Sequence, residues 1–424
     1  MSKTNTAGAA GPGQQTRYQR PVFPFAALVG QPRLKAALLA NAVDPSIGGL
    51  LIRGEKGTGK TTIVRGLAEL LPPLQVVQDC PYHCDPADPD TPHAECRDKI
   101  RATGLETATI PVPLVELPLN ATEERVAGTV HLEETLRTGQ RRFEPGLLAA
   151  ANRGILYIDE VNLLEDHLVD LVLDAAATGV HRVEREGFSL EHPSDFLLVG
   201  TMNPEEGELR PQFIDRFGLC ISVKGESEPA LRKAIARRRI SFEAGPRRFA
   251  EQWRAEQQRL SATVAAAREL LPQVELPEEL WDTIVSYAAQ GGVQGHRADI
   301  VMAKCAVALA ALNSRRRVAP QDVQEAARLA LPHRIGGRVD DTPESAADRL
   351  EQLLAGVQLP DLEAPPQPDA RKSQAPPHDQ PAEKPSAFEG RAERTVDPLE
   401  ELQVPGSAAA GSIVFDFLKK KSPR

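Results

Sequence analysis

The stretch Gly54-Glu55-Lys56-Gly57-Thr58-Gly59-Lys60-Thr61 matches the pattern G-x-x-x-x-G-K-[ST] at every fixed position. The preceding residues 49–53 form a short apolar run suited to a buried parallel strand, and Ile63, Leu67 and Leu70 follow at helical spacing. Strand, glycine-rich loop and helix therefore come in the order that a phosphate-binding loop needs. A glycine-rich turn before an ordinary helix is the weaker interpretation.

This loop predicts a site for ATP and Mg²⁺. Its glycines let consecutive backbone N–H groups turn toward the β-phosphate, and the helix N-terminus adds a partial positive charge. Lys60 can reach the β- and γ-phosphates, while the Thr61 hydroxyl holds Mg²⁺. The residues assigned to nucleotide binding are Gly54, Glu55, Lys56, Gly57, Thr58, Gly59, Lys60, Thr61 and Thr62.

Composition narrows the class of protein. The chain has 424 residues, enough for two or three domains, and 41% of them are hydrophobic. No apolar run approaches the roughly 20 residues of a membrane span, and residues 1–19 lack the apolar core of a signal peptide. A net charge of −9 disfavours broad nucleic-acid binding. We therefore expect a cytoplasmic protein with neither membrane nor nucleic acid as a partner.

The central part of the sequence predicts an α/β fold with a parallel sheet and helices on both faces. Apolar runs at 49–53, 154–158, 196–200 and 219–223 alternate with helical patterns such as 163–177, which places a nucleotide at the carboxyl ends of the strands. Residues 112–142 are expected to form a strand, a polar loop and a hairpin, and residues 180–191 a second hairpin. This ATPase domain is expected to span residues 21–226.

The regions on either side of this domain have a different composition. Residues 1–20 are polar and predicted to be disordered, whereas 227–335 carry helical patterns and predict an all-α lid domain. Residues 336–424 are rich in proline and predict a disordered tail. Its apolar motif at 412–418 is either a docking peptide or a segment with no role. A docking peptide could bind a partner by adding a strand to its sheet.

Polar residues that follow the expected strands predict the rest of the active site. Asp159 and Glu160 follow a strand of four apolar residues, in the Walker B pattern. We assign Asp159 to the Mg²⁺ of the nucleotide and Glu160 to orienting the attacking water. Asn203 follows the next strand and is suited to hold the water or the γ-phosphate.

Three arginines are candidates for stabilising the negative charge of the transition state. Arg216 is the preferred arginine finger, supplied to a neighbouring subunit, and Arg210 is the second choice. Arg297 opens a lid helix and is expected to contact the γ-phosphate. Each of these arginines taken alone is more often a surface salt-bridge residue, so the assignment rests on their order and spacing.

Four segments, at 120–129, 143–149, 157–164 and 207–217, closely resemble the AAA+ ATPase subunit of magnesium chelatase and of related cobalt chelatases. The resemblance covers residues 22–335. It implies an AAA+ P-loop fold and a motor, usually a hexameric ring, that couples ATP hydrolysis to insertion of a metal ion into a tetrapyrrole. It also implies two partners, a larger ATPase-like subunit with an integrin-type domain and a separate tetrapyrrole-binding catalytic subunit.

Val29 and Gly30 become candidates for contacts with adenine, because AAA+ proteins often place such a segment against the base. An N-terminal packing helix is the alternative interpretation of the same residues.

A segment rich in cysteine, proline and aspartate at 78–101 departs from the family pattern. The chain has five cysteines, and three of them, with one histidine, are spaced C-x₃-C-x₈-H-x₂-C as Cys80, Cys84, His93 and Cys96. This donor set suits a structural Zn²⁺, since little else would order such a loop. Free thiols and a redox role remain alternatives, and His83 could replace His93.

Two other functions are consistent with an AAA+ core. A MoxR-like chaperone would remodel a partner protein without any tetrapyrrole, because the ATPase core alone does not name its client. A nucleic-acid-remodelling protein is disfavoured by the net acidity and by the lack of a recognisable DNA-binding module.

Overall fold

The computed structural model describes residues 21–102, 104–130, 143–185, 188–335, 343–357 and 359–360. The expected disordered N-terminus and the apolar motif at 412–418 lie outside these residues. Among the described helices, none is both long and apolar enough to span a bilayer.

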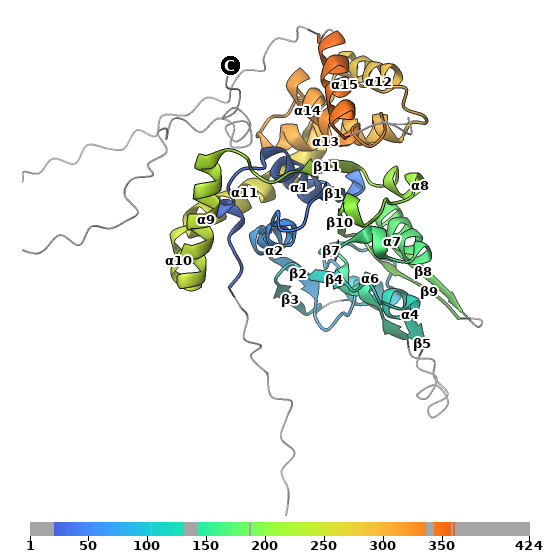
Figure 1. The fold of residues 1–424 in the computed structure, drawn as a ribbon. Helices are drawn as coiled ribbons and strands as arrows, with labels where there is room; N and C mark the ends of the chain where they lie inside the picture. Colours follow the sequence, from blue (N-terminus) through green and yellow to red (C-terminus); the bar gives the residue numbers. More distant parts are fainter. Residues whose placement is uncertain are drawn as a thin grey trace, which may run out of the picture.

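A five-stranded parallel sheet forms the centre of the molecule, as the sequence predicted (Figure 1). Its strands, in spatial order, are β11 (Leu219–Val223), β1 (Leu50–Gly54), β10 (Leu197–Met202), β7 (Ile155–Ile158) and β4 (Leu114–Leu117). Every neighbouring pair is parallel, so the carboxyl ends of β1, β10 and β7 meet at one edge of the sheet. The nucleotide site is expected at this edge.

Alternate residues of each strand enter separate cores on the two faces of the sheet. Leu50 and Ile52 of β1 pack in the core that holds α1 (Pro32–Val43) and α2 (Lys60–Leu70). Leu51 between them packs in the core that holds α6 (Leu147–Ala151) and α7 (Asp166–Thr178). All three side chains are fully buried. A strand buried on both faces has to be apolar throughout, which explains the continuous apolar runs of the sequence.

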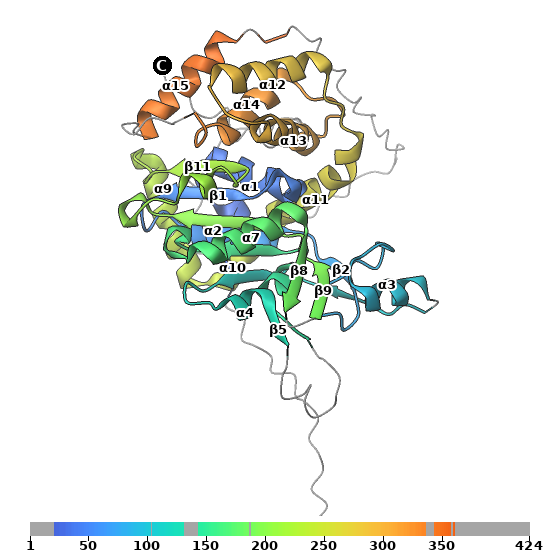
Figure 2. The same cartoon turned by 90° about the vertical axis from the view of Figure 1, so that its right-hand side faces the viewer.

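In the described part of the chain, three antiparallel pairs lie outside the central sheet. They are β2 (Leu74–Val77) with β3 (Thr107–Ile110), β5 (Gly128–Val130) with β6 (Phe143–Pro145), and β8 (Val180–Arg185) with β9 (Phe188–Pro193). The first pair brackets the cysteine-rich segment, which also contains α3 (Ala94–Arg101). The pairing of β2 with β3 and the helix α3 were not predicted from the sequence. The hairpin at 180–191 was predicted. Figure 2 shows α3 at the outer side of the domain, beyond β2 and β9.

Short helices complete the first domain. They are η1 (Phe25–Ala27), η2 (Pro45–Ile47), α4 (Glu123–Ala127), η3 (Val161–Leu163), η4 (Pro204–Glu206) and α8 (Pro211–Ile214).

The helical part of the chain begins after β11. It consists of α9 (Pro229–Ala244), α10 (Pro246–Gln252), α11 (Arg254–Leu270), η5 (Leu271–Gln273), α12 (Glu278–Gln290), α13 (Arg297–Leu312) and α14 (Pro320–Ala330). The lid helices α12 to α14 lie above the sheet in both views (Figures 1 and 2). This arrangement confirms the expected helical lid.

One further helix corrects the expectation of a disordered tail from residue 336. Residues Pro343–Gly356 form α15, which packs beside α12. Its Leu350 and Leu354 are buried in the lid core, and Arg328 of α14 donates two hydrogen bonds to Glu351, at 2.9 and 3.0 Å. The expectation rested on the proline-rich composition of the whole tail and did not consider the helical spacing of these leucines.

Candidate nucleotide site

The phosphate-binding loop joins β1 to α2 as the sequence predicted. Gly54 ends β1 where a Cβ would come within 2.3 Å of the Val223 carbonyl oxygen on β11, so no other residue fits. Gly57 and Gly59 have φ values of 82° and 80°, in the left-handed region that glycine adopts without strain. The Lys60 ammonium donates to the Gly54 carbonyl at 2.5 Å and stays beside the loop.

A cavity of about 580 Å³ opens above this loop. The residues that line it include Val29 and Gly30, Lys56 to Ile63, and the three polar residues Asp159, Glu160 and Asn203. The structure therefore brings together the loop, the two carboxylates, the asparagine and the segment proposed to contact adenine. Gly54 and Glu55, the first two residues of the phosphate-binding motif, are not among the residues that line the cavity.

A chain of hydroxyl groups connects the loop to Asp159. The Thr61 hydroxyl lies 3.0 Å from the Tyr157 hydroxyl, which donates to Asp159 Oδ1 at 3.0 Å. Thr201 donates to the same carboxylate oxygen at 2.6 Å. Burial raises the pKa of Tyr157 to about 12, so this phenol keeps its proton. Sequence reasoning missed Tyr157 and Thr201, although both lie on the strands that carry the site.

Glu160 adopts an unusual backbone conformation, with φ of 56°. A non-glycine residue in the left-handed region is uncommon, and such strain is concentrated at functional sites. Its backbone N–H donates to the Thr201 hydroxyl at 3.1 Å, which fixes this turn. Its carboxylate lies 3.6 Å from the Lys56 ammonium, which also pairs with Glu206. The hydrogen bond with Glu206 raises the pKa of Lys56.

Asn203 is buried at the end of β10 and begins η4. Its side-chain oxygen accepts a hydrogen bond from the Glu205 backbone at 3.3 Å. This leaves the amide nitrogen as the donor for a ligand in the cavity.

Helix α9 contributes residues that sequence reasoning did not assign to the site. Ile235, Arg238 and Arg239 also line the cavity. Arg238 donates to the Ala27 carbonyl at 2.8 Å, and its guanidinium lies over the Trp253 ring. The run of three arginines at 237–239 could have indicated an anion-binding site. Such a run is, however, also typical of an exposed basic helix.

The candidate arginines do not line the cavity of their own chain. Arg216 forms ion pairs with Asp170 and Asp174 of α7, and Arg210 pairs with Asp166 at the start of the same helix. Arg297 lies 3.5 Å from the carbonyl oxygen of Asp215, next to Arg216 in sequence.

The cysteine and histidine residues of the segment at 78–101 also come together. Cys80, Cys84, His93 and Cys96 place one possible ligand atom each within 4.8 Å of one another. His83, the alternative ligand, is not part of this group.

Two protein families match this chain, one over the ATPase domain and one over the helical lid. A family described as "AAA domain (dynein-related subfamily)" matches residues 49–217, and one described as "AAA lid domain" matches 282–353. The second match includes most of α15.

Two curated relatives cover most of the chain. "Magnesium-chelatase subunit ChlI homolog" of Methanocaldococcus jannaschii is 47% identical over 78% of this chain and 91% of its own length. "Magnesium-chelatase subunit ChlI, chloroplastic" of Chlamydomonas reinhardtii is 46% identical over 81% of this chain and 83% of its own length.

Among solved structures, a putative ATPase from Cytophaga hutchinsonii is 19% identical, with a TM-score of 0.53 over 79% of this chain and 92% of its own. At this identity the likeness concerns the fold alone.

Proposed function

The chain belongs to the family of magnesium-chelatase ATPase subunits, and we propose that it hydrolyses ATP to drive insertion of Mg²⁺ or Co²⁺ into a tetrapyrrole held by a separate catalytic subunit. The observation that carries this proposal is the meeting of Lys60, Thr61, Asp159, Glu160 and Asn203 around one cavity. ATP hydrolysis requires a phosphate-binding loop, two carboxylates and a neutral polar side chain.

The residues at the site fit a nucleotide with its magnesium ion. The loop glycines with positive φ turn backbone N–H groups outward, and the cavity has the size of a small-molecule site. Hydroxyl and carboxylate oxygens from Thr61 and Asp159 are the ligands that Mg²⁺ prefers. When bound there, Mg²⁺ would help to neutralise the negative charge that develops on the phosphates.

Each side chain then has a definite part in hydrolysis. Lys60 holds the β- and γ-phosphates, and the burial that lowers its pKa also strengthens its attraction to them. Glu160 orients the attacking water, with Lys56 positioning its carboxylate from 3.6 Å away. Asn203 donates to the water or to the γ-phosphate. Val29 and Gly30 contact the base.

The arginines are supplied to the next subunit of a ring, which we take to be a hexamer. Arg216 and Arg297 both lie beside Asp215, and neither lines the cavity of its own chain. A guanidinium there can stabilise the γ-phosphoryl group only across an interface between subunits. The ring is proposed to work with the integrin-type partner subunit and the tetrapyrrole-binding subunit that the family resemblance implies.

The proposed location is the cytoplasm, as expected from the sequence, although one relative is described as chloroplastic. The chaperone alternative gains no specific support from the site, because the same ATPase core would serve either client.

Reconstitution tests the proposed function directly. The purified chain, the integrin-type partner and the tetrapyrrole-binding subunit are mixed with porphyrin, ATP and either Mg²⁺ or Co²⁺, and metal insertion is followed by porphyrin absorbance and fluorescence. ATP-dependent insertion that is lost with Glu160→Gln supports the proposal. Active ATP hydrolysis without insertion of either metal would contradict it and favour a remodelling role.

A further inference from the structure

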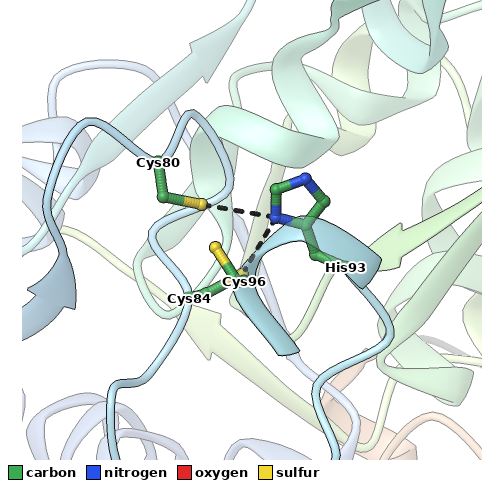
Figure 3. Close-up of side chains that lie close together, drawn as sticks. All are labelled: Cys80, Cys84, His93 and Cys96. Carbon is green, nitrogen blue, oxygen red and sulfur yellow. Dashed lines mark hydrogen bonds between the residues drawn. The ribbon is translucent and has the colours of Figure 1, made fainter. Parts of the chain in front are cut away.

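We propose that Cys80, Cys84, His93 and Cys96 hold a structural zinc ion. The four side chains converge from a loop and a helix, as Figure 3 shows, and their ligand atoms lie within 4.8 Å of one another. All four residues are buried, with 8% or less of their surface exposed. Three sulfur atoms and one imidazole nitrogen form one of the donor sets typical of structural zinc.

The distances between the donors suit a single tetrahedral ion. The Nδ1 atom of His93 lies 3.7 Å from the sulfur of Cys80 and 3.7 Å from that of Cys84. Zinc bonds of about 2.3 Å to sulfur and about 2.0 Å to nitrogen give a sulfur-to-nitrogen edge of about 3.5 Å in a tetrahedron. Both sulfur-to-nitrogen distances therefore exceed this edge by only about 0.2 Å. Four protein ligands close the coordination sphere, which indicates a structural rather than a catalytic ion.

Two short pieces of local structure bring the four donors together. Cys80 and Cys84 lie in a turn after β2, held by the hydrogen bond from the Val77 N–H to the Cys84 carbonyl at 2.9 Å. His93 is the residue before α3, and Cys96 lies three residues later in its first turn. Both side chains point toward the turn that carries Cys80 and Cys84 (Figure 3).

Neighbouring side chains support the ligands. The Thr91 hydroxyl donates to the Cys84 sulfur at 3.5 Å, and the Tyr82 ring packs on the His93 ring with centroids 4.5 Å apart. Tyr82 also packs on His192 of β9, at 4.9 Å, and its carbonyl accepts from Asn152 at 2.7 Å. Such second contacts orient metal ligands. The ion would therefore fix the segment at 78–101 against the ATPase domain.

The segment buries few apolar side chains. Its small apolar cluster consists of the three cysteines with Val77, Tyr82 and Ala149. Its loops are otherwise rich in proline and aspartate, and α3 has only eight residues. A helix this short is marginal without tertiary contacts, so the free energy of metal binding would supply much of the order.

Metal analysis of the full chain, purified without chelator, tests this proposal. Mass spectrometry of the metals should find about one zinc per chain, as expected for a site whose affinity is coupled to folding. Cys84→Ser and His93→Gln should lose it. His83→Gln and Cys305→Ser are the matched controls, because they change a histidine and a buried cysteine outside the group, and they should keep it.

Three measurements on the unchanged chain guard against variants that fail to fold. Titration with a mercurial reagent, in the presence of a zinc indicator dye, should release the ion as three thiols react. Cobalt substitution should give the visible absorption of a tetrahedral thiolate site. Trypsin cleavage at Lys99 and Arg101 of α3 should become about tenfold faster after chelation, because loss of the ion opens the segment locally.

Zinc near zero in the unchanged chain, with the three thiols freely reactive or joined in a disulfide, would overturn the proposal. Retention of full zinc by both Cys84→Ser and His93→Gln would do the same. Loss of zinc in His83→Gln, with retention in His93→Gln, would show that the ligand set is wrong.

Discussion

The Tyr157 hydroxyl lies 3.0 Å from the Thr61 hydroxyl and donates a hydrogen bond of 3.0 Å to Asp159. A phenol has a single proton, so the Thr61 hydroxyl is the donor in its hydrogen bond with the Tyr157 oxygen. The lone pairs of Thr61 then remain available to a metal ion in the cavity. One tyrosine thereby sets the orientation of both side chains proposed to hold Mg²⁺.

Replacing this tyrosine with Phe should lower the ATPase turnover while the fold is retained. A neutral hydrogen bond contributes about 1 kcal/mol, which corresponds to about a fivefold change in rate. The Mg²⁺ concentration that gives half-maximal turnover should also rise. If the bond acts through Thr61, the effects of Tyr157→Phe and Thr61→Ala should not add in a double-mutant cycle. Additive effects, or an unchanged rate, would exclude this role.

Lys60→Ala and Glu160→Gln should separate binding from hydrolysis. The first removes the cation that contacts the β- and γ-phosphates, so both affinity for ATP and turnover should be lost. The second keeps the shape of the side chain but removes its charge, so ATP should bind and remain intact. Equilibrium binding of a fluorescent ATP analogue, alongside phosphate release, measures both. Hydrolysis near the normal rate in Glu160→Gln would remove this residue from the water-orienting role.

The parts of the site that could be predicted from sequence are those fixed by short-range order. Glycines at set spacing, and carboxylates directly after a strand, carry their chemistry in neighbouring residues, so Lys60 and Asp159 were assigned to the site from sequence, and both line the cavity. Tyr157 was not, because an apolar strand hides which of its residues faces the loop. Arg238 reaches the cavity from α9 only through tertiary packing, which no local pattern encodes.

A pH-dependent effect on stability should come from Lys35. Its ammonium is buried and donates to the Leu28 carbonyl at 2.6 Å, and burial lowers its pKa to about 8. Between about pH 8 and the unfolded value near 10.5, the unfolded chain binds more protons than the folded chain at this site. The stability contributed at Lys35 should therefore rise with pH across this window and stay constant below it.

Comparison with Lys35→Met isolates this effect, because methionine does not titrate. The free energy of unfolding in urea should be measured for both proteins at several pH values from 7 to 10. The difference, unchanged chain minus variant, should increase by about 1 kcal/mol for each pH unit above 8. A difference that stays flat, or that falls with rising pH, would show that the folded pKa of Lys35 is not depressed.

Helix α15 should contribute measurably to the stability of the lid. Leu354 is only 2% exposed and packs in the core, so Leu354→Ala should cost about 2–4 kcal/mol in the free energy of unfolding. Gln352→Ala is a suitable control, because Gln352 lies two residues away on the exposed face of the helix. Denaturant unfolding checks both. Equal stability of the two variants would mean that α15 does not pack on the lid in solution.

The last prediction concerns Arg216, whose partners within its own chain are Asp170 and Asp174 of α7. If it stabilises the γ-phosphoryl group of a neighbouring subunit, Arg216→Ala should lose about 10³–10⁵ in turnover with little change in ATP affinity. If it is only a structural salt bridge, the variant should instead melt at a lower temperature and keep its turnover per folded chain.

Mixing two inactive variants distinguishes these roles. A ring containing both Arg216→Ala and Lys60→Ala subunits has some interfaces that pair an intact phosphate-binding loop with an intact arginine. Under conditions where subunits exchange, the mixture should therefore recover part of the ATPase activity that each variant lacks. Arg210→Ala mixed with Lys60→Ala serves as a comparison, since Arg210 pairs with Asp166 of the same helix. No recovery in the Arg216→Ala mixture, despite proven exchange, would mean that Arg216 acts within its own subunit or holds α7 in place.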